Sequence, residues 1–498
     1  MTPKQLKASI LQLAIQGKLV PQDPNDEPAS ELLKRIEAAK NAMGAKKGKP
    51  LPPITDDEKP FSIPDSWEWV RLANLIEDGR AITYGIIKLG KEDPKGVRVL
   101  RCSDVKPGWI DLENVRTVTK KLSEEYKRTI LKGKEVILNV RGTLGGCAVA
   151  DLNVIGYNVA REVAVIPLLQ LISSWYVAYL ILSGYFIDYT ERNLHGIAYK
   201  GLNIEILSRL PVPLPPLAEQ KRIVAKVEAL FKYVDECEDS RKQLAEKLAE
   251  TLKRSVLQEA IQGRLVPQDP NDEPASELLK RIAAEREKQI AEKKIKKSKP
   301  LPPIKDEEKP FPIPDSWEWV RLGELVSAES GLSYKKEDLS ISRDEMVRVL
   351  RGGNILDGKY VFKGDDVFIA KEFAIKRPSI KAFDFVLPAV TSLEHLGKTA
   401  FFEEDRPDVY AGGFLLMLHL LHQNKWIARY LLAFFQSEQY HSYCKNIANK
   451  SGQAFYNLSR EKLCLTPIPI PPLAEQKRIV AKVDSLLAKI EEVRAAVC

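Results

Sequence analysis

The side chains in this sequence that could do chemistry are basic and aromatic residues placed near predicted turns. An arginine can pair with the two acceptors of a guanine or hold a phosphate, and a tyrosine can pack on a base or sugar. For each residue alone, a solvated charge or a half-buried sheet residue is the commoner explanation, so DNA contact is a hypothesis about the whole set. The set consists of Tyr84, Arg98, Arg101, Arg141, Tyr199 and Lys200 in the first half of the chain, and Tyr334, Arg348, Arg351 and Lys450 in the second.

The sequence offers no catalytic motif that would make these residues part of an enzyme. It has no GxxxxGK[ST] phosphate loop, no glycine-rich loop after a strand for adenosylmethionine, and no [DNS]PP[YFW] methyltransferase motif. The six cysteines form no CxxC pair and the five histidines are scattered, which argues against a disulfide framework or a metal site and for a reducing cytoplasm. We therefore expect a non-catalytic cytoplasmic chain that binds no metal and no cofactor.

Charge and hydropathy point in the same direction. The net charge of +8 is modest for 498 residues but has the sign that a nucleic-acid partner requires, although an ordinary basic protein is equally compatible with it. The N-terminus has the pattern of an amphipathic helix rather than a secretory leader, and the longest apolar run, 175–187, is too short to span a bilayer. No membrane partner is expected.

The elements that must position these side chains are organised around one predicted helix. Two prolines at 215–216 suit a helix start, Glu219 suits its first turn, and no glycine or proline follows from 217 to 262. Apolar residues recur there at steps of three and four, which is typical of a helix face and close to a coiled-coil seam. Such a helix would be roughly 70 Å long.

Both halves of this helix are repeated elsewhere. Residues 215–227 recur unchanged at 471–483, and residues 19–36 are identical to 265–282 at all eighteen positions. The C-terminal tail and the N-terminal head would therefore complete a second copy of the central element, if Met1 and Cys498 lie close together. We predict a pseudo-two-fold ring in which helix 473–496 packs antiparallel on the central helix through Ile479, Val483, Leu486 and Ile490.

Between the repeats lie two folded domains. IPDSWEWVRL opens each, at 63–72 and 313–322; VRVLR at 97–101 matches 347–351, and Tyr84 matches Tyr334 at the same offset. The first domain has strand-like pieces at 97–101, 135–140, 147–150 and 161–167 and a helix at 175–189, so we expect an α+β chain with two similar α/β domains held apart by long antiparallel helices. The predicted segments are a head with a linker (1–60), a first domain (61–214), a central helical region with a linker (215–308), a second domain (309–470) and a C-terminal helix (471–498).

The exact repeats are polar and predicted to face solvent, whereas the domains between them have diverged. Either both copies bind identical partners, or local recombination has kept them identical; we favour shared partners. The candidate docking residues are Gln22, Asp23 and Lys34 with their copies Gln268, Asp269 and Lys280.

The doubled PLPPLAEQKRIVAKV and PIPPLAEQKRIVAKV, each closing a variable domain, resemble the specificity subunit of type I restriction–modification systems, as does the head SILQLAIQGKLVPQDPNDEPASELL with its central copy. The resemblance covers essentially the whole chain. It implies two target-recognition domains that each read one half of a split double-stranded DNA site. It also implies two methyltransferase subunits on the helices, which carry the adenosylmethionine, and restriction subunits joining the complex.

Two other functions stay open from the residues. One is a non-catalytic scaffold whose variable domains bind proteins; salt-sensitive retention on DNA would distinguish the two. The other is a single-chain DNA-modifying enzyme, against which the missing cofactor motif argues.

Overall fold

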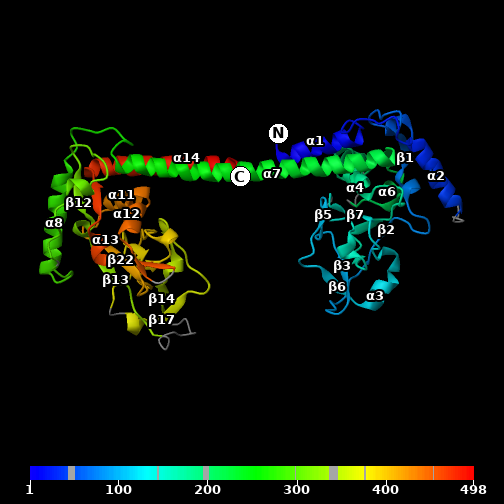
Figure 1. Cartoon of the computed structure of the whole chain (residues 1–498). Helices are drawn as coiled ribbons and strands as arrows, with labels where there is room; N and C mark the ends of the chain where they lie inside the picture. Colours follow the sequence, from blue (N-terminus) through cyan, green and yellow to red (C-terminus); the bar gives the residue numbers. More distant parts are fainter. Residues whose placement is uncertain are drawn as a thin grey trace. The chain divides into compact units, whose positions relative to one another are not determined.

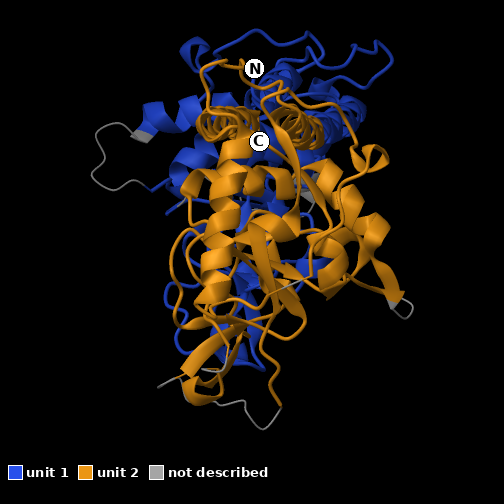
Figure 2. Cartoon of the chain, turned by 90° about the vertical axis from the view of Figure 1, so that its left-hand side faces the viewer, with its two compact units in different colours: residues 1–240 blue, residues 241–498 orange. Residues whose placement is uncertain are grey.

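The protein forms two compact units, residues 1–240 and 241–498 (Figure 2). This computed structural model describes residues 1–42, 51–142, 145–194, 201–297, 299–335, 346–374, 377–451 and 454–497. Cys498 lies outside the described residues, so the expected closeness of the two termini stays a prediction. Within the described residues, none of the helices combines the length and the apolar character needed to cross a membrane.

The central helix is present as a single element, α7 (Leu217–Ile261). It starts after two prolines, and Gly263 ends it with a positive φ of 73°. A side chain at Gly263 would come within 2.6 Å of the ring of Pro314, so glycine is needed for packing as well as for φ. Gly17 ends α1 (Pro3–Ile15) in the same way, with φ of 69° and a 2.5 Å approach to Pro64.

In unit 1, helices and small sheets pack against the first half of α7. The sequence-predicted strands are found within one or two residues of the expected bounds, but the helix expected at 175–189 is two helices, because Ser183 is extended and its hydroxyl caps Leu180. The helices are α2 (Ala29–Ala42), α3 (Lys120–Glu125), α4 (Ser174–Leu182), α5 (Gly184–Leu194) and α6 (Ile204–Arg209). The strands are β1 (Glu68–Arg71), β2 (Thr83–Tyr84), β3 (Val97–Leu100), β4 (Val105–Lys106), β5 (Trp109–Ile110), β6 (Arg116–Val118), β7 (Val136–Asn139), β8 (Cys147–Val149), β9 (Asn158–Val159), β10 (Val163–Ile166) and β11 (Pro211–Leu214).

Unit 2 repeats this plan around the end of α7 and the C-terminal helix. Its helices are α8 (Ala275–Ala291), α9 (Leu322–Leu325), α10 (Lys371–Ala374), α11 (Lys425–Phe435), α12 (Glu438–Ile447), α13 (Arg460–Cys464) and α14 (Leu473–Val497). Its strands are β12 (Glu318–Arg321), β13 (Val326–Ser330), β14 (Met346–Leu350), β15 (Ile355–Leu356), β16 (Lys359–Tyr360), β17 (Val367–Ala370), β18 (Phe385–Pro388), β19 (Val390–Thr391), β20 (Ala400–Phe401), β21 (Val409–Ala411), β22 (Leu415–Leu420), β23 (Asn449–Ser451), β24 (Phe455–Asn457) and β25 (Pro467–Ile470).

The sheets of the two units have matching topology. The four-stranded sheet β2-β10-β7-β8 corresponds to β13-β22-β18-β20, and the three-stranded sheet β6-β3-β9 corresponds to β17-β14-β21. In each three-stranded sheet one neighbour of the middle strand is parallel, β9 beside β3 and β21 beside β14. The pairs β1–β11 and β4–β5 correspond to β12–β25 and β15–β16, and the described part of unit 2 also contains the sheet β19-β24-β23.

Each unit has a main core to which three of the predicted segments contribute. In unit 1, Ile15 of the head, Trp67 of the first domain and Ile223 of α7 are buried in one cluster. In unit 2, Ile261, Trp317 and Ile479 of α14 form the equivalent cluster. In each unit the helical repeats and the folded domain therefore share one hydrophobic core and are not separately folded pieces.

Helix α14 lies antiparallel beside the last part of α7 in unit 2, as the repeats predict (Figure 1). Ile479 and Val483 are buried in the core, and Leu487 packs against it in place of the expected Leu486. This pairing lets the end of α7 and the start of α14 bury their apolar faces inside one unit.

Candidate nucleic-acid interface

Unit 1 contains a cavity of about 620 Å³ between the end of strand β2, the turn at 127–129 and the loops after β7 and β9. Among the described residues, one carboxylate, that of Glu125, and four cationic side chains line it: Lys127, Arg128, Arg141 and Arg161. Tyr84 and Ile87 add aromatic and apolar surface, and Ile87 is 57% exposed. A positive, partly apolar hollow of this kind suits an anionic ligand with flat rings, such as a nucleotide.

Tyr84 and Arg141, both expected to contact DNA, meet in this cavity. The Arg141 guanidinium lies 5.9 Å from the centre of the Tyr84 ring, and the Tyr84 hydroxyl donates a 2.8 Å hydrogen bond to the carbonyl of Leu202. Burial raises the pKa of Tyr84, and the positive charge of Arg141 opposes that rise. Tyr84 is thus fixed as a neutral platform beneath an arginine.

The other candidates in the first domain are not brought to the cavity. Arg101 is tied to Asp104 by hydrogen bonds of 3.2 and 3.1 Å and to the carbonyl of Asn114 at 3.0 Å, so it holds its own loop in place. Arg98 lies on β3 over the ring of Tyr157, with 5.6 Å between guanidinium and ring centre, and donates to the Tyr157 hydroxyl. Tyr199 and Lys200 lie outside the described residues.

In unit 2 the two candidate arginines occupy the same strand positions with internal partners. Arg348 forms an ion pair with the buried Asp366 and lies 4.0 Å from the centre of the Phe362 ring. Arg351 donates to the carbonyl and the carboxylate of Asp365 at 2.6 and 3.1 Å. Both arginines therefore stabilise the sheet and its loops in this structure.

The match between Tyr84 and Tyr334 expected from the sequence is wrong. Ile86 forms a parallel bridge with Ala160, and Leu332 forms the equivalent bridge with Gly412. Counting back two residues from Ile86 and from Leu332, the structural equivalent of Tyr84 is Ser330. The two tyrosines share only the sequence offset, because the segment between this bridge and VRVLR differs in length between the units. Tyr334 instead packs half-buried against a small cluster of unit 2.

The exposed surface of unit 2 presents different chemistry. Phe414 is 75% exposed directly after two glycines, Phe455 is 56% exposed on β24, and Lys450 is exposed on the neighbouring strand β23. The sequence analysis missed both phenylalanines and also Lys127, Arg128 and Arg161. In the sequence, no local pattern separates these residues from other surface residues, so only the folded structure identifies them as candidates.

The candidate docking residues are largely occupied by contacts inside each unit. Gln22 Nε2 donates to Glu219 Oε1 at 2.5 Å, and the Trp67 indole donates to the other oxygen of Glu219 at 2.9 Å. In unit 2 the corresponding distances, from Gln268 and Trp317 to Glu475, are 2.5 and 2.8 Å. Burial raises the pKa of both glutamates, against the opposing effect of these hydrogen bonds.

The rest of the repeated segment divides into internal and exposed residues. Asp26 pairs with Arg222 at 2.6 Å and Asp272 with Arg478 at 2.7 Å, which fastens each loop to a helix start. Asp23 and Asp269 accept hydrogen bonds from Asn25 and Asn271 within the same turn. Lys34 and Lys280 are each 71% exposed and pair with the glutamate three residues earlier.

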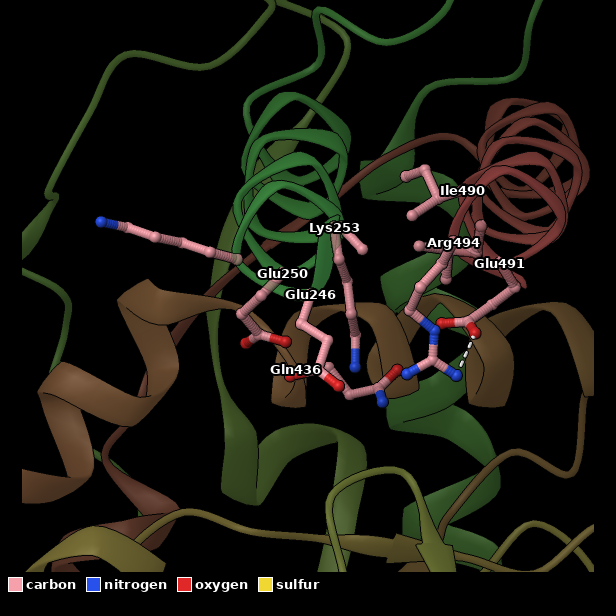
Figure 3. A pocket seen from close by; sticks show the side chains of 10 residues that line it. Glu246, Glu250, Lys253, Gln436, Ile490, Glu491 and Arg494 are labelled. Atoms are coloured by element: carbon pink, nitrogen blue, oxygen red, sulfur yellow. Dashed lines mark ion pairs between the residues drawn. The ribbon is translucent and has the colours of Figure 1, made fainter. Parts of the chain in front are cut away.

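A second hollow, of about 560 Å³, lies in unit 2 between α7, α14 and the end of α11 (Figure 3). Glu246, Lys253 and Gln436 point into it, and Arg494 pairs with Glu491 at 2.7 Å on its wall. Because charges of both signs face this groove, it favours no single class of ligand. Among the described residues there is also no cluster of histidine, cysteine and carboxylate side chains that could hold a metal ion.

Comparison with known proteins decides the family. The model of the "Type I restriction modification DNA specificity domain" matches twice, at residues 64–247 and 314–496. The chain belongs to this type I specificity family. Among curated relatives of the family, the Escherichia coli EcoAI specificity subunit is 32% identical over 97% of this chain and 89% of its own length. The E. coli EcoEI specificity subunit is 30% identical over 99% and 90%.

Solved structures of type I specificity subunits also align along most of the chain. The HsdS subunit from Thermoanaerobacter tengcongensis covers 89% of this chain and 94% of its own, with 18% identity and a TM-score of 0.36. Family membership rests on the sequence similarity, and the two matched copies of the specificity domain lie almost entirely in unit 1 and in unit 2, respectively.

Proposed function

We propose that this chain is the DNA-recognition subunit of a type I restriction–modification complex, in which each unit reads one half of a bipartite, asymmetric site on double-stranded DNA. One observation carries the proposal. Two copies of the specificity domain share an internal frame, in which glutamine and tryptophan donate to Glu219 or Glu475 and an aspartate pairs with Arg222 or Arg478. The exposed surfaces around this frame carry different side chains in the two units.

In this proposal the chain itself is not catalytic. Two methyltransferase subunits dock on the helical regions and bring the adenosylmethionine, and restriction subunits complete the cytoplasmic assembly. The repeated frame supports two equivalent docking sites, because identical loops fastened to identical helix starts offer a partner the same surface twice.

The test is an exchange of residues 73–210 for the equivalent domain of another family member, followed by methylome sequencing of the host. The wild-type chain should add one bipartite motif that is absent from a host lacking the chain. The exchange should change one half of that motif and leave the other half intact. A host methylome that does not depend on this chain, or an exchange that alters both halves, would contradict the proposal.

A further inference from the structure

The cavity of unit 1 carries more positive charge than the shared fold needs. The backbone hydrogen bonds identify equivalent positions: Val140 N donates to Glu162 O at 2.8 Å in unit 1, and Ala389 N donates to Phe414 O at 2.8 Å in unit 2. The residue that follows is Arg141 in unit 1 and Val390 in unit 2. The same strand end is therefore built without an arginine in the other unit.

The second arginine of the cavity gives the same result. Arg161 follows Ala160, whose bridge partner is Ile86, and Gly413 follows Gly412, whose bridge partner is Leu332. A glycine thus occupies the position of Arg161 in unit 2. Unit 2 builds the same strand ends without these two arginines, so their presence around one cavity of unit 1 points to a ligand that uses them.

The four cations differ in how firmly they are held. Within the described ranges, the Arg161 guanidinium has one ion contact, a long one of 3.9 Å to Glu162. Lys127 and Arg128 are exposed and have no ion pair with any described residue. Arg141 alone is held over an aromatic ring, and within the described part of the chain no carboxylate pairs with it. A guanidinium held in one place loses little entropy when it forms paired hydrogen bonds, which suits it to a base edge. Solvated cations on a rim suit phosphates.

We infer that this cavity is the reading site of unit 1, in which Arg141 is the specificity-determining residue for a guanine and Lys127 and Arg128 hold the adjacent phosphates. The inference rests on the proposed function and makes it specific for one half-site. The guanine O6 and N7 acceptors in the major groove match the two parallel donors of an arginine. Arg161 completes the positive wall of the cavity.

The experiment uses the full chain in complex with its methyltransferase subunits. The recognised motif is taken from the host methylome, and the domain exchange at 73–210 identifies the half-site that belongs to unit 1. Binding and methylation are then measured on that DNA, and on every single-base variant of it, for the wild type, Arg141→Ala, Arg141→Lys and the double variant Lys127→Ala/Arg128→Ala. The matched control is Arg209→Ala, which removes an exposed arginine of unit 1 that pairs with Glu205 at 2.7 Å and does not line the cavity.

Arg141→Ala should reduce discrimination roughly tenfold to a hundredfold at one G·C pair of the unit 1 half-site and leave the other half-site unchanged. The Lys127→Ala/Arg128→Ala variant should weaken binding to all sequences and lower the dependence of log K on log salt by about 0.9 for each phosphate that is no longer neutralised. Arg209→Ala should behave as wild type.

Full discrimination by Arg141→Ala at every position would overturn the inference, as would a unit 1 half-site without a G·C pair. An unchanged salt dependence in the Lys127→Ala/Arg128→Ala variant would overturn the phosphate role. All of these outcomes leave a wild-type complex that still reads a bipartite motif, so they are distinct from failure of the proposed function, in which the wild type itself reads no such motif.

Discussion

Units 1 and 2 are most similar in the internal contacts that hold each unit together and least similar in the residues on their exposed surfaces. The bonds from glutamine and tryptophan to Glu219 and to Glu475 agree within 0.1 Å, and so do the two ion pairs that fasten the loops to the helices. By contrast, the equivalent surface positions hold Arg141 and Val390. A shared internal frame thus leaves the surface free to change.

This difference corrects the explanation of the repeated segments. Identical polar residues suggested identical partners, on the assumption that these residues face solvent. Gln22 and its copy Gln268 are indeed exposed, but they donate to the buried carboxylates of Glu219 and Glu475. Asp26 and its copy Asp272 are half-buried and pair with Arg222 and Arg478. Removing one member of such a network leaves a buried group unpaired, which is costly. Internal contacts alone therefore account for part of the identity, and only the exposed remainder calls for a partner.

The frame should lose most stability when its buried arginine is removed. Arg71 binds both oxygens of Glu58 at 2.7 Å, and Arg321 binds both oxygens of Glu308 at 2.8 Å in the same geometry. Each also donates to three backbone carbonyls, those of Pro52, Pro53 and Arg209 in unit 1 and those of Pro302, Pro303 and Leu465 in unit 2. Arg71→Met and Arg321→Met should each destabilise their own unit by about 3–5 kcal/mol, since the carboxylate and carbonyls lose their partner.

Hydrogen exchange followed by mass spectrometry in the full chain can assign the loss to one unit. We expect faster exchange across 1–240 for Arg71→Met and across 241–498 for Arg321→Met, by similar factors. Arg209→Met, at a surface ion pair, should cost about 1 kcal/mol or less. Unequal losses for the two buried arginines would break the equivalence of the frames.

The reading surfaces should respond differently, and Phe414 tests this. It occupies in unit 2 the position of Glu162 in unit 1, and its 75% exposure leaves the ring free to stack on a base. Phe414→Ala should weaken DNA binding by about 1–3 kcal/mol, with the change confined to the half-site of unit 2. Phe414→Trp should retain binding, and Glu162→Ala should have little effect, as measured by titration of labelled DNA with the complex. Equal losses from Phe414→Ala and Glu162→Ala would show that the two units read DNA by similar means.

The pH dependence of stability should again be equal in the two units. Hydrogen bonds from Arg71 lower the pKa of Glu58 to about 2, and those from Arg321 do the same for Glu308. Because the unfolded chain, with a pKa near 4.5, then binds the proton more tightly than the folded one, the stabilisation is present above pH 4.5 and is lost as the pH falls toward 2. The raised pKa of Glu219 and Glu475 has the opposite sign: their contribution is present below pH 4.5 and is lost as the pH rises through the folded value.

Denaturation midpoints at several pH values between 6 and 2.5 can separate these groups. Glu58→Gln and Glu308→Gln should each flatten the loss of stability on the acid side, and by the same amount. An acid limb as steep in both variants as in the wild type would mean that these carboxylates are not the groups that titrate.

The sequence predicted the frame better than the reading surface. Exact repeats and a helix uninterrupted from 217 to 262 led directly to α7 and α14, because helix periodicity and internal identity are local signals. The reading surface depends on which loops the sheets bring together. Arg101 and Arg141 look alike in the sequence, yet Asp104 and Asn114 bind the first, whereas the second faces a cavity. The match of Tyr334 to Tyr84 failed because loop lengths changed between landmarks.

The smallest expected effect concerns the exposed part of the repeated segment, where the two units should be interchangeable. Lys34 and Lys280 have the same exposure, 71%, and similar ion pairs of 2.7 and 2.6 Å to Glu31 and Glu277. If both copies dock a methyltransferase subunit, Lys34→Glu or Lys280→Glu should each weaken one docking site by about 1 kcal/mol or less, because exposed charges are screened. The double variant should weaken both sites, while the recognised motif stays the same. Subunit stoichiometry by native mass spectrometry, at complex concentrations near the dissociation constant, measures this.

The double variant Lys59→Glu/Lys309→Glu is the control, since those lysines form matched surface pairs with Asp56 and Asp306 at 2.8 and 2.7 Å outside the repeated segment. A deletion of 19–36 would not serve, because it also removes Gln22 and Asp26 from the frame. A wild-type complex with one methyltransferase subunit, or full assembly of the Lys34→Glu/Lys280→Glu variant under conditions that resolve 1 kcal/mol (about fivefold in affinity), would confine the role of the repeat to holding each unit together.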